Sequence, residues 1–344
     1  MILPPEIFTI VCEYLSLHDI SSLILTNHKV NKWVDMDDVI REYYLARGDM
    51  IDGLVMAACK NGYINLLMYL HRTKNAIPYD AIKYASLHGH LPIVEYLCTI
   101  GVDPTTSNND AIKWASIKGH ISIVKYLCSV GVDPTVDDNY TIQWASKNGH
   151  LPIVEYLRSV GADPTANDNY PIILASNGGY LPLVKYLYSV GADITARNNT
   201  PIQLACQNGH LDVVKYLQSV GVYSVGTHNS LMRVACHGDH LSVVKYLCSI
   251  GTDPTADVNR SLKFACIYGR LPIVEYLCSI GADPTTDNND PLKLACRSGR
   301  LSVAKYLCSI GADPRADDNA PIKLASKGRQ IKVVRYLRTC GATL

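Results

Sequence analysis

The stretch Leu271–Asp290, "LPIVEYLCSIGADPTTDNND", decides the fold, because nearly the same letters stand one period before it and one period after it. The earlier copy reads "LSVVKYLCSIGTDPTADVNR", and the later copy reads "LSVAKYLCSIGADPRADDNA". Tyr96 begins a series of nine tyrosines spaced by 30 residues, and a divergent copy in residues 54–70 precedes it. Such self-similarity is the signature of a stacked repeat architecture, so the sequence predicts ten copies of one structural unit.

Each unit is predicted to form a helix, a tight turn, a second helix and an exposed loop. The apolar residues recur at helical spacing: Ile112, Ala115 and Ser116 in residues 110–120, then Ile121, Val124, Leu127 and Val130 in residues 121–130. Gly119 suits a left-handed turn because glycine has no Cβ, and Gly131 followed by Pro134 ends the second helix. A single unit cannot bury its apolar face alone, so the units must stack.

Three constant positions have a structural interpretation. The tyrosines are predicted to pack between repeats with their hydroxyls near solvent. The asparagine series that begins at Asn109 is interpreted as turn or helix N-cap residues. Histidine fills a third position in five repeats, but Tyr180, Arg270, Arg300 and Gln330 replace it elsewhere. A position with such replacements is no metal ligand or catalytic base, so we predict no catalytic residue and no metal site.

The composition is that of a folded protein with almost no net charge. Hydrophobic residues make up 48% of the chain, charged residues make up 18%, and the net charge is +1. This balance creates no field that would draw the chain to nucleic acid or to an anionic membrane, and no apolar run is long enough to span a bilayer. The first residues, "MILPPEIF", do not resemble a signal peptide.

Nine of the 12 cysteines occupy two positions of the repeat, which is not the pattern of a set of disulfide bonds. Ser86 and Ser116 stand where later repeats have Cys206 and Cys236, and Arg158 fills another cysteine position. Positions that accept such replacements are not half-cystines, and no second ligand pair completes a zinc site. We therefore expect free thiols, a reducing intracellular compartment and no cofactor.

The phrase "NGHLDVVKYLQSVGV" and loops such as "GADPTTDNN" resemble the ankyrin repeat, which reads roughly G-H-x-x-V-V-x-L-L-L-x-x-G-A-D. The family's T-P-L-H survives in part at residues 200–203, "TPIQ", and the unit has 30 residues where about 33 are usual. The resemblance implies an all-α ankyrin-repeat solenoid of about ten helix pairs over residues 54–344. Its finger loops are expected to be shortened to turns, and its polar last repeat is expected to act as a cap.

The repeat sequences, which are rich in Tyr, Asn and Ile, are similar to those of ankyrin proteins from giant amoeba-infecting viruses of the mimivirus group. This similarity implies a viral protein that acts in the host cytoplasm. A capped solenoid is expected to be a monomer.

Positions that vary between the copies are free of the demands of stacking and are predicted to form a groove for a protein partner. They fall in two classes, one at the end of the first helix and one in the loop before the asparagine series. The predicted groove residues are Ser107, Ile117, Lys118, Asp137, Lys147, Asn148, Asn167, Arg197, Gln207, His237, Asp257, Ile267, Tyr268, Asp287, Arg297 and Asp317. The alternative is that these side chains are solvated and drift without function.

Two places depart from the 30-residue repeat pattern, and either could be functional or a product of drift. Residues 222–230, "VYSVGTHNS", lose the A-D-P loop, and Asp239 stands where other copies have Gly. At the far end, residues 327–338 carry a basic cluster that could bind an acidic partner, but a polar cap explains it more simply.

Residues 1–35 lie outside the period and resemble the F-box, whose motif reads roughly L-P-x-E-x-x-x-x-I-x-x-Y-L-x-x-x-D-L. The resemblance implies that apolar helices here dock on the Skp-type adaptor of a cullin–RING ubiquitin ligase. The residues that would contact the adaptor are Leu3, Pro4, Ile7, Val11, Tyr14, Leu15, Ile20 and Leu23. Residues 36–53 would form a joining helix and linker, and the alternative is that residues 1–35 only cap the first repeat.

The sequence therefore predicts an interaction protein and not an enzyme. In the first hypothesis it is a substrate receptor that links a target in the groove to a host ubiquitin ligase. In the second it is an ankyrin scaffold or decoy that binds a host or viral protein without a ligase. An enzyme is a distant third, because no nucleophile–base arrangement lies outside the repeat positions and no phosphate-binding glycine loop occurs.

Overall fold

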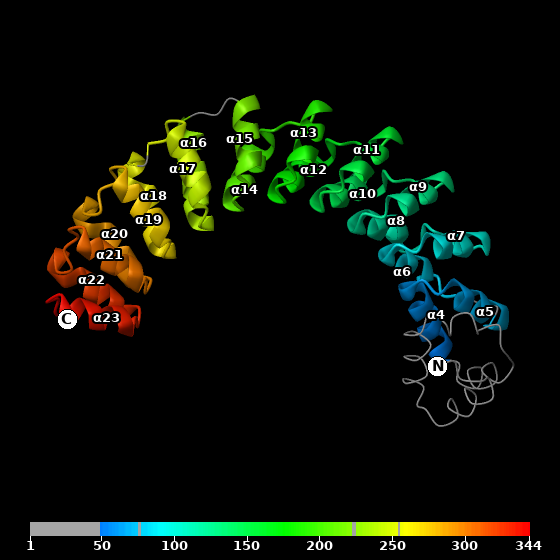
Figure 1. Ribbon diagram of the computed structural model, residues 1–344, viewed down its shortest axis with the longest axis horizontal. Coiled ribbons are helices and arrows are strands. Elements are labelled where there is room, and N and C mark those ends of the chain that lie inside the picture. The colour runs from blue at the N-terminus through cyan, green and yellow to red at the C-terminus, as the bar shows by residue number, and fades with distance from the viewer. Residues whose placement is uncertain (1–48, 75–76, 222–224, 254) are drawn as a thin grey trace, which may run out of the picture. The chain divides into compact units, whose positions relative to one another are not determined.

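The computed structural model describes residues 49–74, 77–221, 225–253 and 255–344 (Figure 1). Within these ranges the chain forms twenty helices, α4 to α23, and no strand. The predicted all-α repeat of ten helix pairs, with fingers reduced to turns, is confirmed. No helix in the described ranges is long and apolar enough to cross a membrane.

Each repeat contributes an inner helix followed by an outer helix. The inner helices are α4 (Asp49–Asn61), α6 (Ala81–His88), α8 (Thr106–Lys118), α10 (Val136–Lys147), α12 (Ala166–Asn177), α14 (Ala196–Gln207), α16 (Val225–Gly238), α18 (Ala256–Tyr268), α20 (Thr286–Arg297) and α22 (Ala316–Lys327). The outer helices are α5 (Ile64–Lys74), α7 (Leu91–Thr99), α9 (Ile121–Ser129), α11 (Leu151–Ser159), α13 (Leu181–Ser189), α15 (Leu211–Val220), α17 (Leu241–Ser249), α19 (Leu271–Ser279), α21 (Leu301–Ser309) and α23 (Ile331–Thr339).

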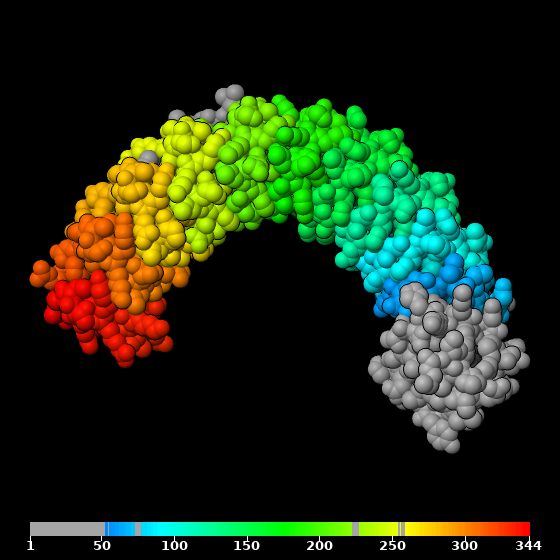
Figure 2. Space-filling model, viewed as in Figure 1, coloured from blue at the N-terminus to red at the C-terminus, as the bar shows by residue number. Residues whose placement is uncertain are grey.

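The chain divides into two compact units, one up to Asn167 and one from Asp168 onward. Within each unit the helix pairs stack in chain order, and the space-filling view shows neighbouring pairs packed against one another (Figure 2). Inner helices contact the inner helices of adjacent repeats, and outer helices contact outer ones more sparsely. The inner helices therefore form the tightly packed side of each stack.

The core repeats the same few positions. In α8, Ile112, Ala115 and Ser116 are fully buried, as the helical spacing predicts. The prediction for the outer helix is partly wrong. Ile123 is buried in α9 together with Val124 and Leu127, whereas Ile121 is only half-buried and Val130 is 45% exposed. Val130 is the C-cap residue of α9, so the spacing continued one residue beyond the helix that generates it.

A left-handed turn replaces the finger at the start of most inner helices. Ser107, Asn108 and Asn109 have φ values of 53°, 62° and 61°, and five later repeats have the same three-residue geometry. Residues with a Cβ are strained in this region, and Asn and Asp tolerate it best because their side chains hydrogen-bond to nearby backbone. The richness of the loops in Asn and Asp is explained by this turn.

Five members of the asparagine series join their repeat to the next one. The side-chain oxygen of Asn139 accepts a hydrogen bond from the backbone N–H of Asp163 at 2.9 Å, and that of Asn289 accepts one from Asp313 at 2.8 Å. Asn169, Asn259 and Asn319 make the same contact 24 residues ahead. The predicted role in satisfying a backbone donor is confirmed, but the donor lies in the following loop and not at the N-terminus of the residue's own helix.

The glycine that ends an inner helix lies under the histidine of the next repeat. Gly119 has φ 84°, and a Cβ there would lie 2.8 Å from Cε1 of His150. The Nε2–H of His150 donates a hydrogen bond to the carbonyl of Ile117 at 3.0 Å, because a carbonyl can only accept. Arg300 makes an equivalent bond to the carbonyl of Ile267, so His150 and Arg300 both donate to a carbonyl near the end of the preceding inner helix.

Candidate functional site

The inner helices have a second side that the core does not use. In α8, Trp114 and Ile117 are half-buried and Lys118 is exposed, while Ile112 and Ala115 are buried. We define the inner-helix face as the side chains of the inner helices that point away from the buried positions.

The structure places the predicted groove residues at the surface but in two separate places. Eleven are exposed, namely Ser107, Lys118, Asp137, Lys147, Asn167, Arg197, Gln207, His237, Asp287, Arg297 and Asp317. Ile117, Asn148, Ile267 and Tyr268 are half-buried, and the side chain of Asp257 lies outside those described. The loop class lies at the start of each inner helix and the other class at its end. The two classes therefore do not form one cluster.

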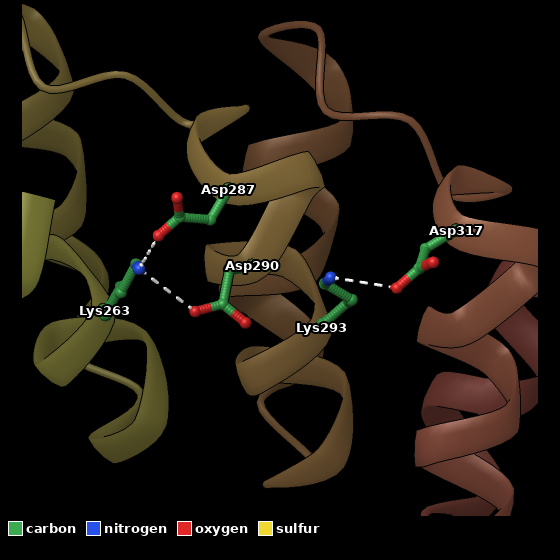
Figure 3. A network of polar contacts seen from close by, with 5 residues as sticks. All are labelled: Lys263, Asp287, Asp290, Lys293 and Asp317. Carbon is green, nitrogen blue, oxygen red and sulfur yellow. Dashed lines mark hydrogen bonds and ion pairs between the residues drawn. The ribbon is translucent and has the colours of Figure 1, made fainter. Parts of the chain in front are cut away.

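The aspartates of the loop class form ion pairs with the preceding repeat. Lys113 Nζ lies 2.7 Å from Asp137, and Lys293 Nζ lies 3.2 Å from Asp317. Lys263 contacts Asp287 and lies 3.2 Å from Asp290. Figure 3 shows Lys263 and Lys293 extending from their helices to the loop of the following repeat. These carboxylates are therefore paired with lysines of the neighbouring repeat.

The loop position varies together with a residue 24 positions earlier. Lysine precedes Asp137, Asp287 and Asp317 at this spacing, and Arg233 precedes Asp257. Where the earlier residue is Gln143, Ile173 or Gln203, the loop residue is Asn167, Arg197 or Thr227 and never an acid. Lys83 is the exception, because it pairs with Asp110 at 2.8 Å. The residue at the loop position therefore depends largely on the side chain that it contacts in the preceding repeat. Its variation between the copies does not require a binding partner as an explanation.

The ion pairs shift the pKa values of their members. The hydrogen bond from Lys113 lowers the pKa of Asp137, and a second one from Asn108 adds to the effect. The hydrogen bond to Asp110 raises the pKa of Lys83 against a smaller opposing effect of burial. Burial opposes the charge of Lys263 as well, but its bonds to Asp287 and Asp290 raise its pKa.

A row of aromatic side chains occupies the inner-helix face of the first unit. Tyr84 in α6, Trp114 in α8 and Trp144 in α10 stand at one repeat position, and all three are half-buried. We call these three residues the aromatic row. The same position holds Leu174, Leu204, Val234, Phe264, Leu294 and Leu324 in the second unit. The row was not predicted from the sequence, although the change from aromatic to mostly aliphatic residues along the 30-residue period could have indicated it.

Lysine side chains lie over the aromatic row. Lys60 Nζ lies 4.7 Å from the ring centroid of Tyr84, and Lys147 Nζ lies 4.3 Å from that of Trp144. Lys83 lies 6.0 Å from the Trp114 ring, at the limit of a useful cation–π contact. The face thus combines exposed cations with partly exposed rings.

A smaller cluster lies on the inner-helix face of the second unit. The rings of His237 and Tyr268 meet edge to face with centroids 4.4 Å apart, and Phe264 stacks on Tyr268 at 6.3 Å. Asp239, which breaks the glycine position, lies 3.4 Å from Arg270, the residue that replaces histidine in the next repeat. The two exceptions compensate one another, so Asp239 has a structural explanation.

The His, Cys, Asp and Glu side chains are the groups of the described residues that could hold a metal ion. The described residues contain no group of three or more such side chains placed to do so. Burial raises the pKa of the thiols of Cys236 and Cys296 to about 12, so they stay protonated at neutral pH. The adaptor-contacting residues predicted for the F-box-like segment, from Leu3 to Leu23, all lie outside the described residues.

Comparison with known proteins agrees with the repeat geometry. The family model described as ankyrin repeats (3 copies) matches residues 54–138, 142–225, 223–288 and 262–344. None of the curated proteins matches the chain.

Proposed function

The chain belongs to the ankyrin-repeat family, and from that premise we propose that it is a substrate receptor that binds a target protein on its inner-helix face. Ankyrin repeats are protein–protein interaction modules, and the helix pairs here serve as a scaffold that presents side chains. The observation that carries the proposal is the aromatic row of Tyr84, Trp114 and Trp144, which the core does not bury completely. Aromatic residues at such positions dominate the energetics of protein interfaces.

The second part of the proposal concerns residues 1–35. Their likeness to an F-box supports docking on a Skp-type adaptor, which would deliver the bound target to a cullin–RING ubiquitin ligase. Leu3, Val11, Tyr14 and Leu15 carry this likeness. The proposed setting is the cytoplasm of a virus-infected host cell. It rests on the similarity of the repeat sequences to those of viral ankyrin proteins. The monomeric state rests on the capped ends of a solenoid, and the protein is proposed to act without an enzymatic activity of its own.

Target binding is tested by photo-crosslinking with the full chain in host-cell extract. A photoreactive residue is placed at Lys118, on the end of α8, or at Lys125, on the outer helix α9 of the same repeat. We expect a discrete crosslinked protein from position 118 and none from position 125. Equal labelling from both positions would contradict binding on the inner-helix face.

Ligase recruitment is tested separately, by co-purification of the full chain with a purified Skp-type adaptor. The double substitution Leu3→Asp and Leu15→Asp should abolish this co-purification and leave the crosslink at position 118 intact. A scaffold or decoy, the second hypothesis, predicts no adaptor binding by either chain. Loss of the crosslink in the double variant would contradict the division of labour between the two parts.

A further inference from the structure

Positive charge collects at the ends of the inner helices in the first unit. Residues 59–62, 87–90, 117–120 and 147–150 contain lysines and histidines and no acidic residue. Lys60, Lys118 and Lys147 are exposed, and no carboxylate among the described residues pairs with them. We call these three lysines the basic edge.

Two members of this edge, Lys60 and Lys118, lie close enough to the side chain of His88 to affect it. Burial, and after it the positive charges of His90, Lys60, Lys118 and His120, lower the pKa of His88. Cations of three successive repeats therefore surround the end of α6. A bound anion would relieve their mutual repulsion, which is electrostatic complementarity in its simplest form.

The aromatic row adjoins the basic edge. Lys60 lies over Tyr84 and Lys147 lies over Trp144, so edge and row share side chains. A ligand that pairs with these lysines is brought within reach of the half-buried rings. Trp and Tyr side chains in this setting are the common anchors of interfaces.

Two structural explanations cover only part of this arrangement. Cations at the end of a helix are favoured by the helix dipole, which accounts for lysine in the last turn. Contacts between lysine and aromatic rings add some stability to the stack. Neither explains why the first unit has Tyr84, Trp114 and Trp144 where the second unit folds with Leu204 and Leu294.

We propose that the inner-helix face of α4, α6, α8 and α10 binds an acidic segment of a protein partner whose carboxylates alternate with apolar side chains. The carboxylates pair with the basic edge, and the apolar side chains pack on the aromatic row. The proposal rests on the proposed function, because it names the chemistry of the target that this face would take.

A protein segment fits better than a nucleic acid. Asp110 and Asp137 lie at the other end of the same inner helices, where each is paired with a lysine, so the unpaired positive charge is confined to the basic edge and does not cross the face as a phosphate chain would. The net charge of +1 also gives no general attraction to a polyanion. A segment with spaced carboxylates can place them on the basic edge alone.

The test uses the full chain and a synthetic peptide in which Glu and Leu alternate. Binding is measured by isothermal titration calorimetry and by tryptophan emission in a Trp33→Phe background, where Trp114 and Trp144 are the remaining tryptophans of the 3 in the chain. We expect saturable binding that weakens with salt, together with a shift of the emission. A Lys–Leu peptide should not bind. Equal binding of the Lys–Leu peptide, or tighter binding of an oligothymidylate, would overturn the proposal.

The variants are chosen so that the chain itself provides their controls. Lys118→Glu and Lys125→Glu make the same change in charge within one repeat, and Glu already stands at the equivalent of Lys125 in Glu95, Glu155 and Glu275. We expect Lys118→Glu to weaken the Glu–Leu peptide at least tenfold and Lys125→Glu to leave it within about twofold, since rim charges contribute little. Equal weakening by both would show a general charge effect and overturn the site.

The aromatic row is tested with Trp114→Leu and Trp144→Leu together, because leucine fills this position in folded repeats of the same chain. We expect an unchanged circular dichroism spectrum and at least a tenfold loss of affinity, typical of interface anchors. Unchanged affinity would overturn the role of the row. If the peptide does not bind while crosslinking at position 118 persists, the acidic partner is wrong and the proposed function stands.

Discussion

At the scale of single residues, the ion pair of Lys113 and Asp137 shows how one repeat is matched to the next. The Lys113 side chain is only 11% exposed and lies between Asp137 and the ring of Tyr140, whose centroid is 5.3 Å from Nζ. A lysine held in this way needs its partner, because an unpaired charge in a buried position is costly. The correlated change of the two positions along the chain follows from this need.

This pairing predicts a pH dependence at Asp137. Its pKa in the folded chain lies below the ordinary value of 3.8, so ionisation favours the folded state. The stabilisation is complete above the unfolded value and is lost as the pH falls through the lower, folded value. Carboxyl-carbon NMR should show the depressed pKa of Asp137, and Lys113→Met should return it toward 3.8. An unchanged titration in Lys113→Met would contradict the pairing.

A buried position occupied by serine in one set of repeats and by cysteine in another predicts the effect of exchanging them. The hydroxyl of Ser116 is fully buried and has no hydrogen-bond partner, while Cys266 fills the same position in the second unit. An unsatisfied buried hydroxyl costs about 1–3 kcal/mol, and a thiol tolerates burial far better. Ser116→Cys should raise the free energy of unfolding by about 1 kcal/mol, measured by urea denaturation.

Cys266→Ser is the reverse experiment and should lower the free energy of unfolding by a similar amount. The two substitutions leave the helix propensity nearly equal, so the change isolates burial of the polar group. Opposite signs for the two variants support the interpretation. A loss of stability in both would show that local packing, and not the unsatisfied hydroxyl, decides the choice.

At the scale of the element, the left-handed turn stands in place of a hairpin finger. Its last residue is Asn109 in one repeat and Asn289 in another, with φ values of 61° and 64°. Both asparagines are 9% exposed, but only Asn289 accepts a hydrogen bond from the next loop. The side-chain oxygen of Asn109 has no partner.

The pair makes a matched test of the bond between repeats. Asn289→Ala loses both the tolerance of the left-handed region and the hydrogen bond, whereas Asn109→Ala loses only the first. The difference between the two losses in unfolding free energy should be about 1 kcal/mol, the usual net value of such a bond. Thermal or urea unfolding of the two variants measures it. Equal losses would mean that the bond adds nothing to the turn itself.

The glycines of each repeat separate backbone strain from side-chain collision. Gly119 and Gly131 both have positive φ, at 84° and 96°, but only at Gly119 would a Cβ meet His150. Gly131→Ala should cost about 1–2 kcal/mol for the left-handed conformation, and Gly119→Ala should cost clearly more. Adding His150→Ala should recover part of the loss at Gly119 and none at Gly131. A double-mutant cycle by urea denaturation checks this.

At the scale of the whole molecule, the sequence predicted what the repetition itself determines. The helix pairs and the turning glycines follow from positions that recur every 30 residues. The asparagine series satisfies backbone donors as predicted, but the donors lie in the following loop and not in the residue's own helix. The limits of the outer helix were less predictable, since Val130 continues the apolar pattern one residue past the helix end. A pattern in sequence cannot show which of two adjacent apolar residues the neighbouring repeat will cover.

The candidate site was predicted only in outline. The variation between copies groups Lys118 and Lys147 with Asp137, Asp287 and Asp317, but each of these aspartates pairs with a lysine of the preceding repeat. Pairing across 24 residues joins positions that belong to different copies, so a comparison of equivalent positions does not reveal it. The aromatic row was not predicted for a different reason. Most repeats have an apolar residue at its position, and such a residue is typical of the buried core.

In a repeat array each repeat contacts only its immediate neighbours, so a cavity should lower the stability of the chain locally. Leu127 in α9 and Leu307 in α21 are both fully buried and belong to different units. Each Leu→Ala substitution should cost about 2–5 kcal/mol through lost contacts and a residual cavity.

In the Trp33→Phe background, emission from Trp114 and Trp144 reports the first unit, while circular dichroism reports all helices. Leu127→Ala should lower the urea midpoint seen by both signals, and Leu307→Ala should lower that of circular dichroism and leave the emission midpoint nearly unchanged. Coincident shifts in both variants would instead show that the ten repeats unfold as one cooperative body.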